Sequence, residues 1–386
     1  MGRIYRIALR ECGIMRGNPI YLFCLVLFPL LVIFFFTSFM EKGQPTDLPV
    51  GVVDLDKSSM TRALTRKLDA FQTTRIVAHY PNINEARKAI QQNKIDGFIY
   101  FPKNTMSDLL ASRQPKISFY YNYACITSGS LVFRDLKTIS MLGSAAVGSA
   151  KLSALGKTPK EIKAFLQPIA IDLHPLNNPG VNYNVYLSTA LIPACLMVFF
   201  FLISAYSIGT ELKFDRSKEW LALADNNIVV AMTGKVLPHF IINISIMYFY
   251  MYYLYGILGF PHAGSIWSIL LLGLAAVLAG QGFGIFAFGL MPSLRMSMSI
   301  CSLWAALSFS AMGSTFPISA MNPMIQSLAQ LFPMRHYFMF YQTCIFNGHP
   351  ISDAWIHLGA LFIFAALPLF VLQKIKNAML TYEYIP

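Results

Sequence analysis

Charged side chains are scarce in this sequence. Asp, Glu, Lys and Arg make up only 12% of its 386 residues, about half of the roughly 25% found in ordinary soluble domains. Hydrophobic residues make up 55%, including 31 Phe and 19 Tyr. The interior of a soluble fold cannot hide that much apolar surface. The composition therefore predicts an integral membrane protein that carries a smaller soluble part.

Cysteine is also rare. Only Cys125 of the six cysteines falls within the polar stretch 41–184, so this stretch has no internal disulfide. No two cysteines form a Cys-x-x-Cys pair, and none stands near His at a spacing typical of zinc sites. We therefore expect the cysteines to be small apolar residues of membrane helices, and we expect no metal site.

Motifs of common enzymes are absent too. The sequence contains no His-Glu-x-x-His, no Gly-x-Ser-x-Gly and no Leu-Ser-Gly-Gly-Gln. Gly156-Lys157-Thr158 is similar to the end of a phosphate loop, but Lys151 stands where a Walker A motif needs Gly. We therefore predict no catalytic residue and no cofactor bound by this chain.

Long apolar runs are what the sequence does contain. A spanning helix needs about 20 apolar residues. Six runs qualify, namely Tyr21–Phe39, Val185–Ile208, Val236–Leu258, Ile266–Met291, Met296–Phe316 and Trp355–Leu372. A further stretch, 317–346, is interrupted by Pro317, Pro323 and Pro333. Irregular backbone at membrane depth is tolerated only inside protein, so we expect a re-entrant or interfacial hairpin there.

Basic residues of the short connecting segments gather on one side of these spans. They occur before the first span, in the 209–235 loop and in the tail, whereas the 259–265 loop has none. Cytoplasmic loops are enriched in Lys and Arg, so both termini are predicted to be cytoplasmic and 41–184 extracytoplasmic. The first apolar run is longer than that of a signal peptide and no cleavage site follows it, so we expect an uncleaved anchor.

The predicted fold class is an α-helical membrane protein with six transmembrane helices, an extracytoplasmic mixed α/β domain, and a re-entrant hairpin after the fifth span. Residues 1–19 are predicted to form an amphipathic helix on the cytoplasmic membrane surface, with Arg3, Arg6 and Arg10 on its polar face. The remaining predicted segments are the first span 20–40, the extracytoplasmic domain 41–184, five spans within 185–373, and the tail 374–386.

The polar block 41–184 alternates between strand and helix patterns. Strands are predicted at Leu48–Asp54, Thr74–Tyr80, Asp96–Phe101, Lys116–Tyr123 and, less regularly, Ile169–Leu173. Helices are predicted at Ser58–Phe71, Asn84–Gln92 with Asn84 as its cap, Asn104–Ala111 and Ser128–Leu155. This alternation indicates a small sheet of mainly parallel strands with helical crossovers. Asp54 and Asp56 are expected to cap the helix that follows them, with a cation site as the alternative.

Asp, Glu, Lys and Arg are missing from all six apolar cores. Ion-driven carriers usually keep a buried carboxylate for the coupling ion, so energy for transport would have to come from elsewhere. The polar groups that remain are mild: His239, Asn243 and Gln281. We expect them to make hydrogen bonds between helices, and a substrate path is the alternative.

The 209–235 loop is dense in charges of both signs. The segment Glu211–Leu221 includes Asp215, Arg216, Lys218 and Glu219 with Phe214, Trp220 and Leu221 among them. This mixture favours a short helix that docks into a groove on a partner protein.

Three motifs resemble the permease subunit of a type-2 ABC exporter, in the subgroup with a large domain between the first two spans. The loop ends in Gly234-Lys235-Val236-Leu237-Pro238, and Glu219 and Leu221 match the family pattern before it. The proline-rich stretch carries Pro317, Met321-Asn322-Pro323, Phe332-Pro333 and Tyr337. The polar block opens with Val52-Val53-Asp54-Leu55-Asp56-Lys57-Ser58.

This resemblance implies a dimer of permeases with two separate ATPase subunits, which would bind ATP and magnesium. It assigns coupling to the ATPase to Glu211, Asp215, Arg216, Lys218, Glu219, Trp220 and Leu221, and the re-entrant hairpin to Pro317, Met321, Pro323, Pro333 and Tyr337. It also implies a periplasmic adaptor, an outer-membrane channel, and a place in a bacterial inner membrane. The substrate would be hydrophobic or amphipathic, drug-like or lipid-like.

Other classes of protein remain as alternatives. A membrane-anchored sensor should have a cytoplasmic output domain, and no predicted cytoplasmic segment exceeds about 30 residues. A lipid-modifying enzyme would have to use His336 with Arg335 and Tyr337. A nucleic-acid partner is not expected although the net charge is +12, because residues 41–184 hold 18 of the 30 basic and 11 of the 18 acidic residues and are predicted to lie outside the cytoplasm.

Overall fold

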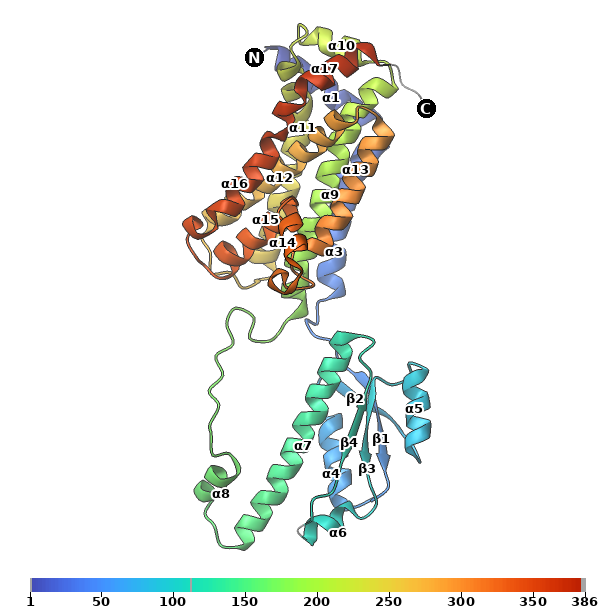
Figure 1. The fold of residues 1–386 in the computed structure, drawn as a ribbon, viewed down its shortest axis with the longest axis vertical. Coiled ribbons are helices and arrows are strands. Elements are labelled where there is room, and N and C mark those ends of the chain that lie inside the picture. Colours follow the sequence, from blue (N-terminus) through green and yellow to red (C-terminus); the bar gives the residue numbers. More distant parts are fainter. Residues whose placement is uncertain (1, 112, 383–386) are drawn as a thin grey trace. The chain divides into compact units, whose positions relative to one another are not determined.

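A computed structural model describes residues 2–111 and 113–382. Within these residues the chain divides into two compact units, coloured by sequence in Figure 1. Lys42–Pro175 form one unit, and the segments before and after it together form the other. Residues 176–184, which the sequence places in the polar block, therefore belong with the helices.

The unit Lys42–Pro175 is built on a four-stranded sheet in the order β2-β1-β3-β4. Its strands are β1 Leu48–Asp54, β2 Thr74–His79, β3 Gly97–Phe101 and β4 Ser118–Tyr121. β1 is parallel to β2 and β3, and β4 is antiparallel to β3. Parallel neighbours need a crossover, which α4 (Ser59–Asp69) and α5 (Ile83–Gln91) provide. The β–α alternation read from the sequence is thus present.

Different helices cover the two faces of this sheet (Figure 1). α4 and the long α7 (Ile126–Ala154) pack on the face that carries Val50 and Val52. α5 packs on the other face, against Val53 and Phe98. Side chains alternate between the faces of a strand, so the neighbours Val52 and Val53 enter separate cores. The unit is completed by α6 (Thr105–Leu110) and α8 (Pro159–Leu166).

Asp54, which ends β1, and Asp56, which follows it, do not cap the next helix. Ser58 takes that position, and its Oγ accepts a hydrogen bond from the Thr61 amide at 3.2 Å. Asp54 accepts from the Thr61 hydroxyl through Oδ2, and Asp56 accepts from the Met106 amide in the first turn of α6 at 3.2 Å. The two carboxylates therefore hold the loop and a second helix, and the prediction that they cap α4 is wrong.

Two other local predictions in this unit are wrong. Asn82, not Asn84, caps α5, because its Oδ1 accepts from the Glu85 amide at 2.9 Å. The stretch Ile169–Leu173 forms no strand within the described sheet. Its apolar side chains are exposed, so no buried face favours pairing it with a neighbour.

Five helices in the described part of the chain are long and apolar enough to cross a membrane. They are Pro19–Phe39, Tyr183–Lys213, Ile228–Ile257, Ile266–Leu290 and Ile351–Thr381. The stretch expected as the fifth of six spans forms α13 (Leu294–Ala311), which has 18 residues and is not among the five. Its several serines lower its hydropathy. A count of six spans stays a prediction.

Several of these helices are interrupted. The first consists of α2 (Pro19–Leu22), a π-helical turn (Phe23–Leu27) and α3 (Phe28–Phe39). The second is α9 (Tyr183–Lys213), the third α11 (Ile228–Tyr252) with a π-helical turn (Tyr253–Ile257), and the fourth α12 (Ile266–Leu290). The last contains a 3₁₀ turn (Ile351–Ala354), α16 (Trp355–Ala366), a second 3₁₀ turn (Leu367–Phe370) and α17 (Leu372–Thr381).

Glycines let α9 and α12 pack closely. A Cβ on Gly284 would lie 2.4 Å from the Phe201 carbonyl oxygen, and one on Gly280 would lie 2.7 Å from the Phe200 Cβ. Small residues at such spacing allow helices to approach each other in a membrane. The pair therefore forms the centre of the helical unit, and the residues at the ends of α9 are held in fixed positions.

The two ends of the helical unit differ. α1 (Gly2–Gly17), α10 (Ser217–Leu223) and α17 gather at one end (Figure 1). At the other end a 3₁₀ turn (Ile318–Ala320), α14 (Pro323–Ala329), α15 (Pro333–Phe340) and a π-helical turn (Tyr341–Phe346) occupy the proline-rich stretch. These helices are too short to span a bilayer. Their re-entrant placement stays a prediction. The predicted tail 374–386 is partly helical, and residues 383–386 lie outside the described residues.

Candidate functional site: a buried charge cluster

The N-terminal helix α1 packs into the protein along one face. Ile7 and Glu11, four residues apart, are both buried, as i and i+4 positions share a face of a helix. Gly234 of α11 lets this face approach, since a Cβ there would lie 2.8 Å from the Ile7 Cβ. α1 therefore rests against α11 rather than only on a membrane surface.

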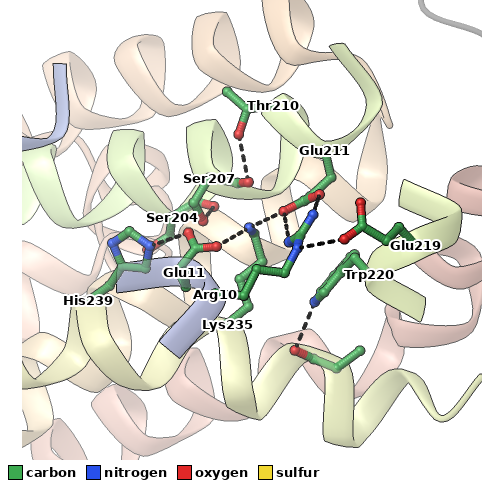
Figure 2. Close-up of polar contacts among 11 residues, drawn as sticks. Arg10, Glu11, Ser204, Ser207, Thr210, Glu211, Glu219, Trp220, Lys235 and His239 are labelled. Atoms are coloured by element: carbon green, nitrogen blue, oxygen red, sulfur yellow. Dashed lines mark hydrogen bonds and ion pairs between the residues drawn. The ribbon is translucent and has the colours of Figure 1, made fainter. Parts of the chain in front are cut away.

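Four charged side chains and one His meet where α1, α9 and α11 join, and we call this set, Arg10, Glu11, Glu211, Lys235 and His239, the charge cluster (Figure 2). The Lys235 Nζ donates to Glu11 at 2.6 Å and to Glu211 at 2.7 Å. Both nitrogens of the Arg10 fork donate to Glu211, at 2.8 and 3.0 Å. One ammonium thus links two helices to a third.

The burial of the cluster decides its energetics. The side chain of Lys235 is 0% exposed and those of Glu11 and Glu211 are 1% exposed. An unpaired charge at such a site would cost several kcal/mol of desolvation. Two cations, Arg10 and Lys235, are balanced by two carboxylates. The charges of these four side chains therefore balance, and the removal of any one of them leaves an excess charge in the cluster.

Glu11 is held from both sides. Its Oε2 faces Lys235 and its Oε1 lies 2.9 Å from the His239 Nε2. Burial alone would raise the pKa of the Glu11 carboxyl, but the Lys235 ammonium and the His239 ring lower this pKa to about 2. The carboxylate is thus charged at neutral pH. The other ring nitrogen of His239 has no partner within the described residues.

The short helix α10 is fastened to the cluster. Glu219 lies 3.7 Å from the Arg10 Nε. The Trp220 indole donates to the Ala231 carbonyl of α11 at 3.2 Å, and the Lys235 ammonium lies 5.5 Å from the centre of the same ring, within the range of a cation–π contact. A movement of α10 would therefore also move α1 and α11.

A comparison with known proteins decides the family. Residues 19–372 match the sequence model of a family described as ABC-2 family transporter protein. The chain belongs to the ABC-2 transporter family. It is therefore the permease component of an ABC transporter and a multi-pass membrane protein, and the family implies that a separate ATPase subunit hydrolyses ATP.

The permease is also similar to Nodulation protein J of Neorhizobium galegae. The two are 36% identical over 69 residues. These residues are 18% of the permease and 26% of the relative, so the permease spans about a quarter of the length of that protein.

Five of the residues predicted for coupling lie on or beside α10, and they differ in exposure. Asp215, Lys218 and Glu219 are exposed on or beside α10. Trp220 and Leu221 are completely buried in the permease itself, so the prediction that their side chains dock into a partner's groove is wrong. The apolar face of α10 packs against its own chain, where the Ala231 carbonyl accepts a hydrogen bond from the Trp220 indole.

Glu211 and Arg216 take different places. Glu211 lies within α9 as a member of the charge cluster, because α9 continues to Lys213. The Arg216 guanidinium lies 4.9 Å from the centre of the exposed Phe214 ring. The expected 209–235 loop is consequently mostly helical, formed by the end of α9, by α10 and by the start of α11.

The mild polar residues of the membrane core do not form one site. His239 joins the charge cluster. Asn243 and Gln281 are buried, and the amide nitrogen of each lacks a partner within the described residues. A substrate path along these residues stays a prediction.

The predicted amphipathic arginines also separate. Arg10 is in the cluster, Arg3 pairs with Asp225 at the end of α10, and Arg6 is exposed. The polar face of α1 is thus partly used for contacts within the permease.

In the proline-rich stretch, prolines start helices. Pro323 and Pro333 occupy the first positions of α14 and α15, where a missing N–H costs nothing. Pro317 and Met321 flank the 3₁₀ turn, and Tyr337 is buried.

His336 is buried as well. Its Nδ1 lies 3.0 Å from the Nδ1 of His357, and its Nε2 lies 2.8 Å from the Gln330 carbonyl oxygen. A carbonyl accepts only, so Nε2 carries the proton and the two Nδ1 atoms share another. This pair is a structural contact between α15 and α16, which removes the open ring nitrogen that a lipid-modifying enzyme would need.

Glu11 is the functional candidate that reading the sequence missed. The signal was present, because Glu11 is the one acidic residue among the arginines before the first span. It also stands four residues after Ile7, on the apolar face. An acid on the apolar face of a basic helix indicates a buried partner.

Proposed function

We propose that this permease is the membrane subunit of an ATP-driven exporter that works as a dimer. Its substrate would be a hydrophobic or amphipathic molecule, taken from the cytoplasm or the inner leaflet of a bacterial inner membrane. ATP and magnesium would be bound by a separate ABC ATPase. Both termini would be cytoplasmic, with Lys42–Pro175 in the periplasm, where an adaptor and an outer-membrane channel would continue the path.

The observation that carries this proposal is the attachment of α10 to two membrane-spanning helices. α10 presents exposed charges outward and fully buried Trp220 inward. Through the charge cluster it is tied to α9 at Glu211 and to α11 at Lys235. A push on α10 by a closing ATPase dimer would therefore move both spans together.

The buried charges suit this role better than an apolar contact would. Charged hydrogen bonds have defined partners and directions, so the three helices keep one register while they move. Replacing such a set by apolar residues often preserves stability, so we infer that the set contributes a specific geometry more than extra stability. The hydrogen bond from Ser217 Oγ to the Met379 carbonyl at 2.8 Å adds α17 to the same assembly.

A charge reversal on α10 tests the proposal. Glu219 is 65% exposed, so Glu219→Arg should leave the helices folded. The change reverses a charge on the surface that we propose faces the ATPase, and it also removes the contact of Glu219 with Arg10. We expect less ABC ATPase to co-purify with the tagged permease and transport-coupled ATP hydrolysis to fall about tenfold, the effect of roughly 1.4 kcal/mol.

Two further variants complete this experiment, one as a second test and one as a control. Lys218→Glu reverses a neighbouring exposed charge without facing Arg10, and it should weaken ATPase association too. Glu85→Arg reverses an exposed charge in the other unit and should have no effect. Normal co-purification and normal ATP hydrolysis in both α10 variants would contradict the coupling role.

A further inference from the structure

A groove opens beside the charge cluster, between the corner where α1 meets the first span and the side of α11. Its volume is about 460 Å³. It is lined by Cys12, Met15, Arg16, Tyr21, Leu22, Leu25, Val26, Pro238, Ile241 and Ile242. Arg16 is the only charged residue among them. The groove is therefore an apolar channel with a single positive charge.

The position of the groove limits what can occupy it. One wall comes from the helix Pro19–Phe39 and the other from the helix Ile228–Ile257, both of which are apolar enough to cross a membrane. Leu22 is 65% exposed and Ile241 is 54% exposed. Side chains of this kind on spanning helices contact hydrocarbon in a bilayer, so an acyl chain is the occupant that the walls fit.

The shape of the groove has a local cause. Asn18 caps α2 and Pro19 follows it, so α1 ends and the chain turns into the span. A π-helical turn, Phe23–Leu27, then widens the first part of this span. Such wide turns disturb the regular packing of a helix surface, and here the turn supplies Leu25 and Val26 to the wall.

The charge of α1 selects the headgroup. Arg3 and Arg10 have carboxylate partners in Asp225 and Glu211. Arg6 and Arg16 are exposed and form no ion pair within the described chain. Of these two, only Arg16 lines the groove. A guanidinium is suited to bind phosphate through two parallel hydrogen bonds.

We propose that this groove is a binding site for one anionic phospholipid. An acyl chain lies between Leu25 and Ile242, and the phosphate binds Arg16 at the mouth. The lipid would wedge against the side of α11 that lies next to the charge cluster, so it would brace the same helix that Lys235 ties to α10. The proposal does not depend on the direction or substrate of transport.

Lipid counting by native mass spectrometry tests the headgroup. The intact permease in a non-ionic detergent is titrated with phosphatidylglycerol or phosphatidylcholine. Both lipids carry a phosphate, but the choline of phosphatidylcholine adds a positive charge that weakens its attraction to Arg16. We therefore expect one phosphatidylglycerol to bind at least about tenfold more tightly, a difference of roughly 1.4 kcal/mol or more. Arg16→Gln should abolish this preference. Arg6→Gln, on the same helix and also exposed, should keep it.

The thiol of Cys12 provides a second measurement at the same site. Cys12 and Cys125 are exposed, and the other four cysteines are partly or fully buried. In a Cys125→Ser background, phosphatidylglycerol should slow maleimide modification of Cys12 severalfold, and Val26→Trp, which fills the groove, should remove this protection. Leu31→Trp, also lipid-facing but outside the groove, should retain it.

Each contrary outcome overturns the proposal. Equal loss of preference in Arg16→Gln and Arg6→Gln would show a general attraction of a basic helix to anionic lipid. Equal binding of the two lipids would show that the site does not select an anionic headgroup. Protection of Cys12 that survives Val26→Trp would place the lipid elsewhere.

Discussion

At the scale of single residues, the charge cluster depends on the carboxylate of Glu11. It is the acid through which α1 holds both Lys235 and His239. Its lowered pKa of about 2 follows from these partners, whose effect outweighs the rise that burial alone would cause. Composition and periodicity identified Arg10 as part of an amphipathic helix and Glu211 as part of a charged connecting segment. They could not place Glu11 against Lys235, since 224 residues separate the two and only the tertiary fold joins them.

Neutralising Glu11 should be costly. Glu11→Gln leaves the buried Lys235 and the partly exposed Arg10 against the single carboxylate of Glu211. Breaking a buried pair by removal of one partner costs about 3–5 kcal/mol, so we expect a large drop in the thermal unfolding midpoint in detergent. Glu41→Gln, at an exposed carboxylate, is the control. An unchanged midpoint for Glu11→Gln would show that the cluster carries little net stability.

The pair His336–His357 predicts a response to acid. Burial lowers the pKa of His336, the Gln330 carbonyl raises it in part, and the Arg335 charge lowers it further. The folded pKa is below the usual 6.5, so the unfolded state binds more protons as pH falls. Stability should therefore be full above about pH 6.5 and should decline below it.

A variant separates this pair from other titrating groups. His336→Gln keeps hydrogen-bonding groups and removes the titration, so its unfolding midpoint should change less between pH 7.5 and pH 5 than that of the parent protein. His262→Gln, at a His of another segment, should keep the parent's pH dependence. Parallel curves for the parent and His336→Gln would contradict the assignment.

At the scale of elements, what could be predicted depended on local pattern. β1 begins and ends where the apolar run Leu48–Asp54 predicted it, because a short apolar run with β-branched residues indicates a strand. The fifth predicted span stays a prediction, because the run 296–316 is apolar on average but rich in serine. Its helix stops at Ala311, before Gly313, whose φ of 97° few residues other than Gly adopt.

The close packing of α9 on α12 yields a prediction of its own. Gly284→Ala places a Cβ 2.4 Å from the Phe201 carbonyl oxygen, so the two helices must separate. We expect a loss of about 1–3 kcal/mol, as in other overpacked cores, read as a lower unfolding midpoint. Gly359→Ala has nothing within 4 Å and should be neutral or slightly stabilising, because Ala favours helix. Equal effects of the two would contradict the close contact.

At the scale of the whole molecule, the polar block and the helices are separate folding problems. The block has two cores of its own, one on each face of the sheet. Its polar composition and its alternation of strand and helix patterns predicted a separate α/β unit. Its end at Pro175 was harder to place, since the stretch before α9 is irregular and has no periodicity to read.

The separateness of the block can be measured. Residues 42–175 expressed alone should be soluble and should show α/β circular dichroism with one cooperative thermal transition, because both faces of its sheet are covered within the fragment. The fragment Leu48–Tyr121 lacks α7, which supplies Val132 and Leu136 to one core, and should not unfold cooperatively. A non-cooperative 42–175 fragment would show that the block needs the rest of the chain.

The burial of Trp220 has an optical consequence. The chain has four tryptophans, and Trp220 is the one that is 0% exposed, with an ammonium beside its ring. An indole in such surroundings emits at shorter wavelength than one in water, and a nearby cation shifts its spectrum through the local electric field. With Trp267, Trp304 and Trp355 changed to Phe, the permease would carry one tryptophan, at the contact between α10 and α11. Its emission wavelength would then report any movement of α10 relative to α11, including the movement that we propose an ATPase would cause.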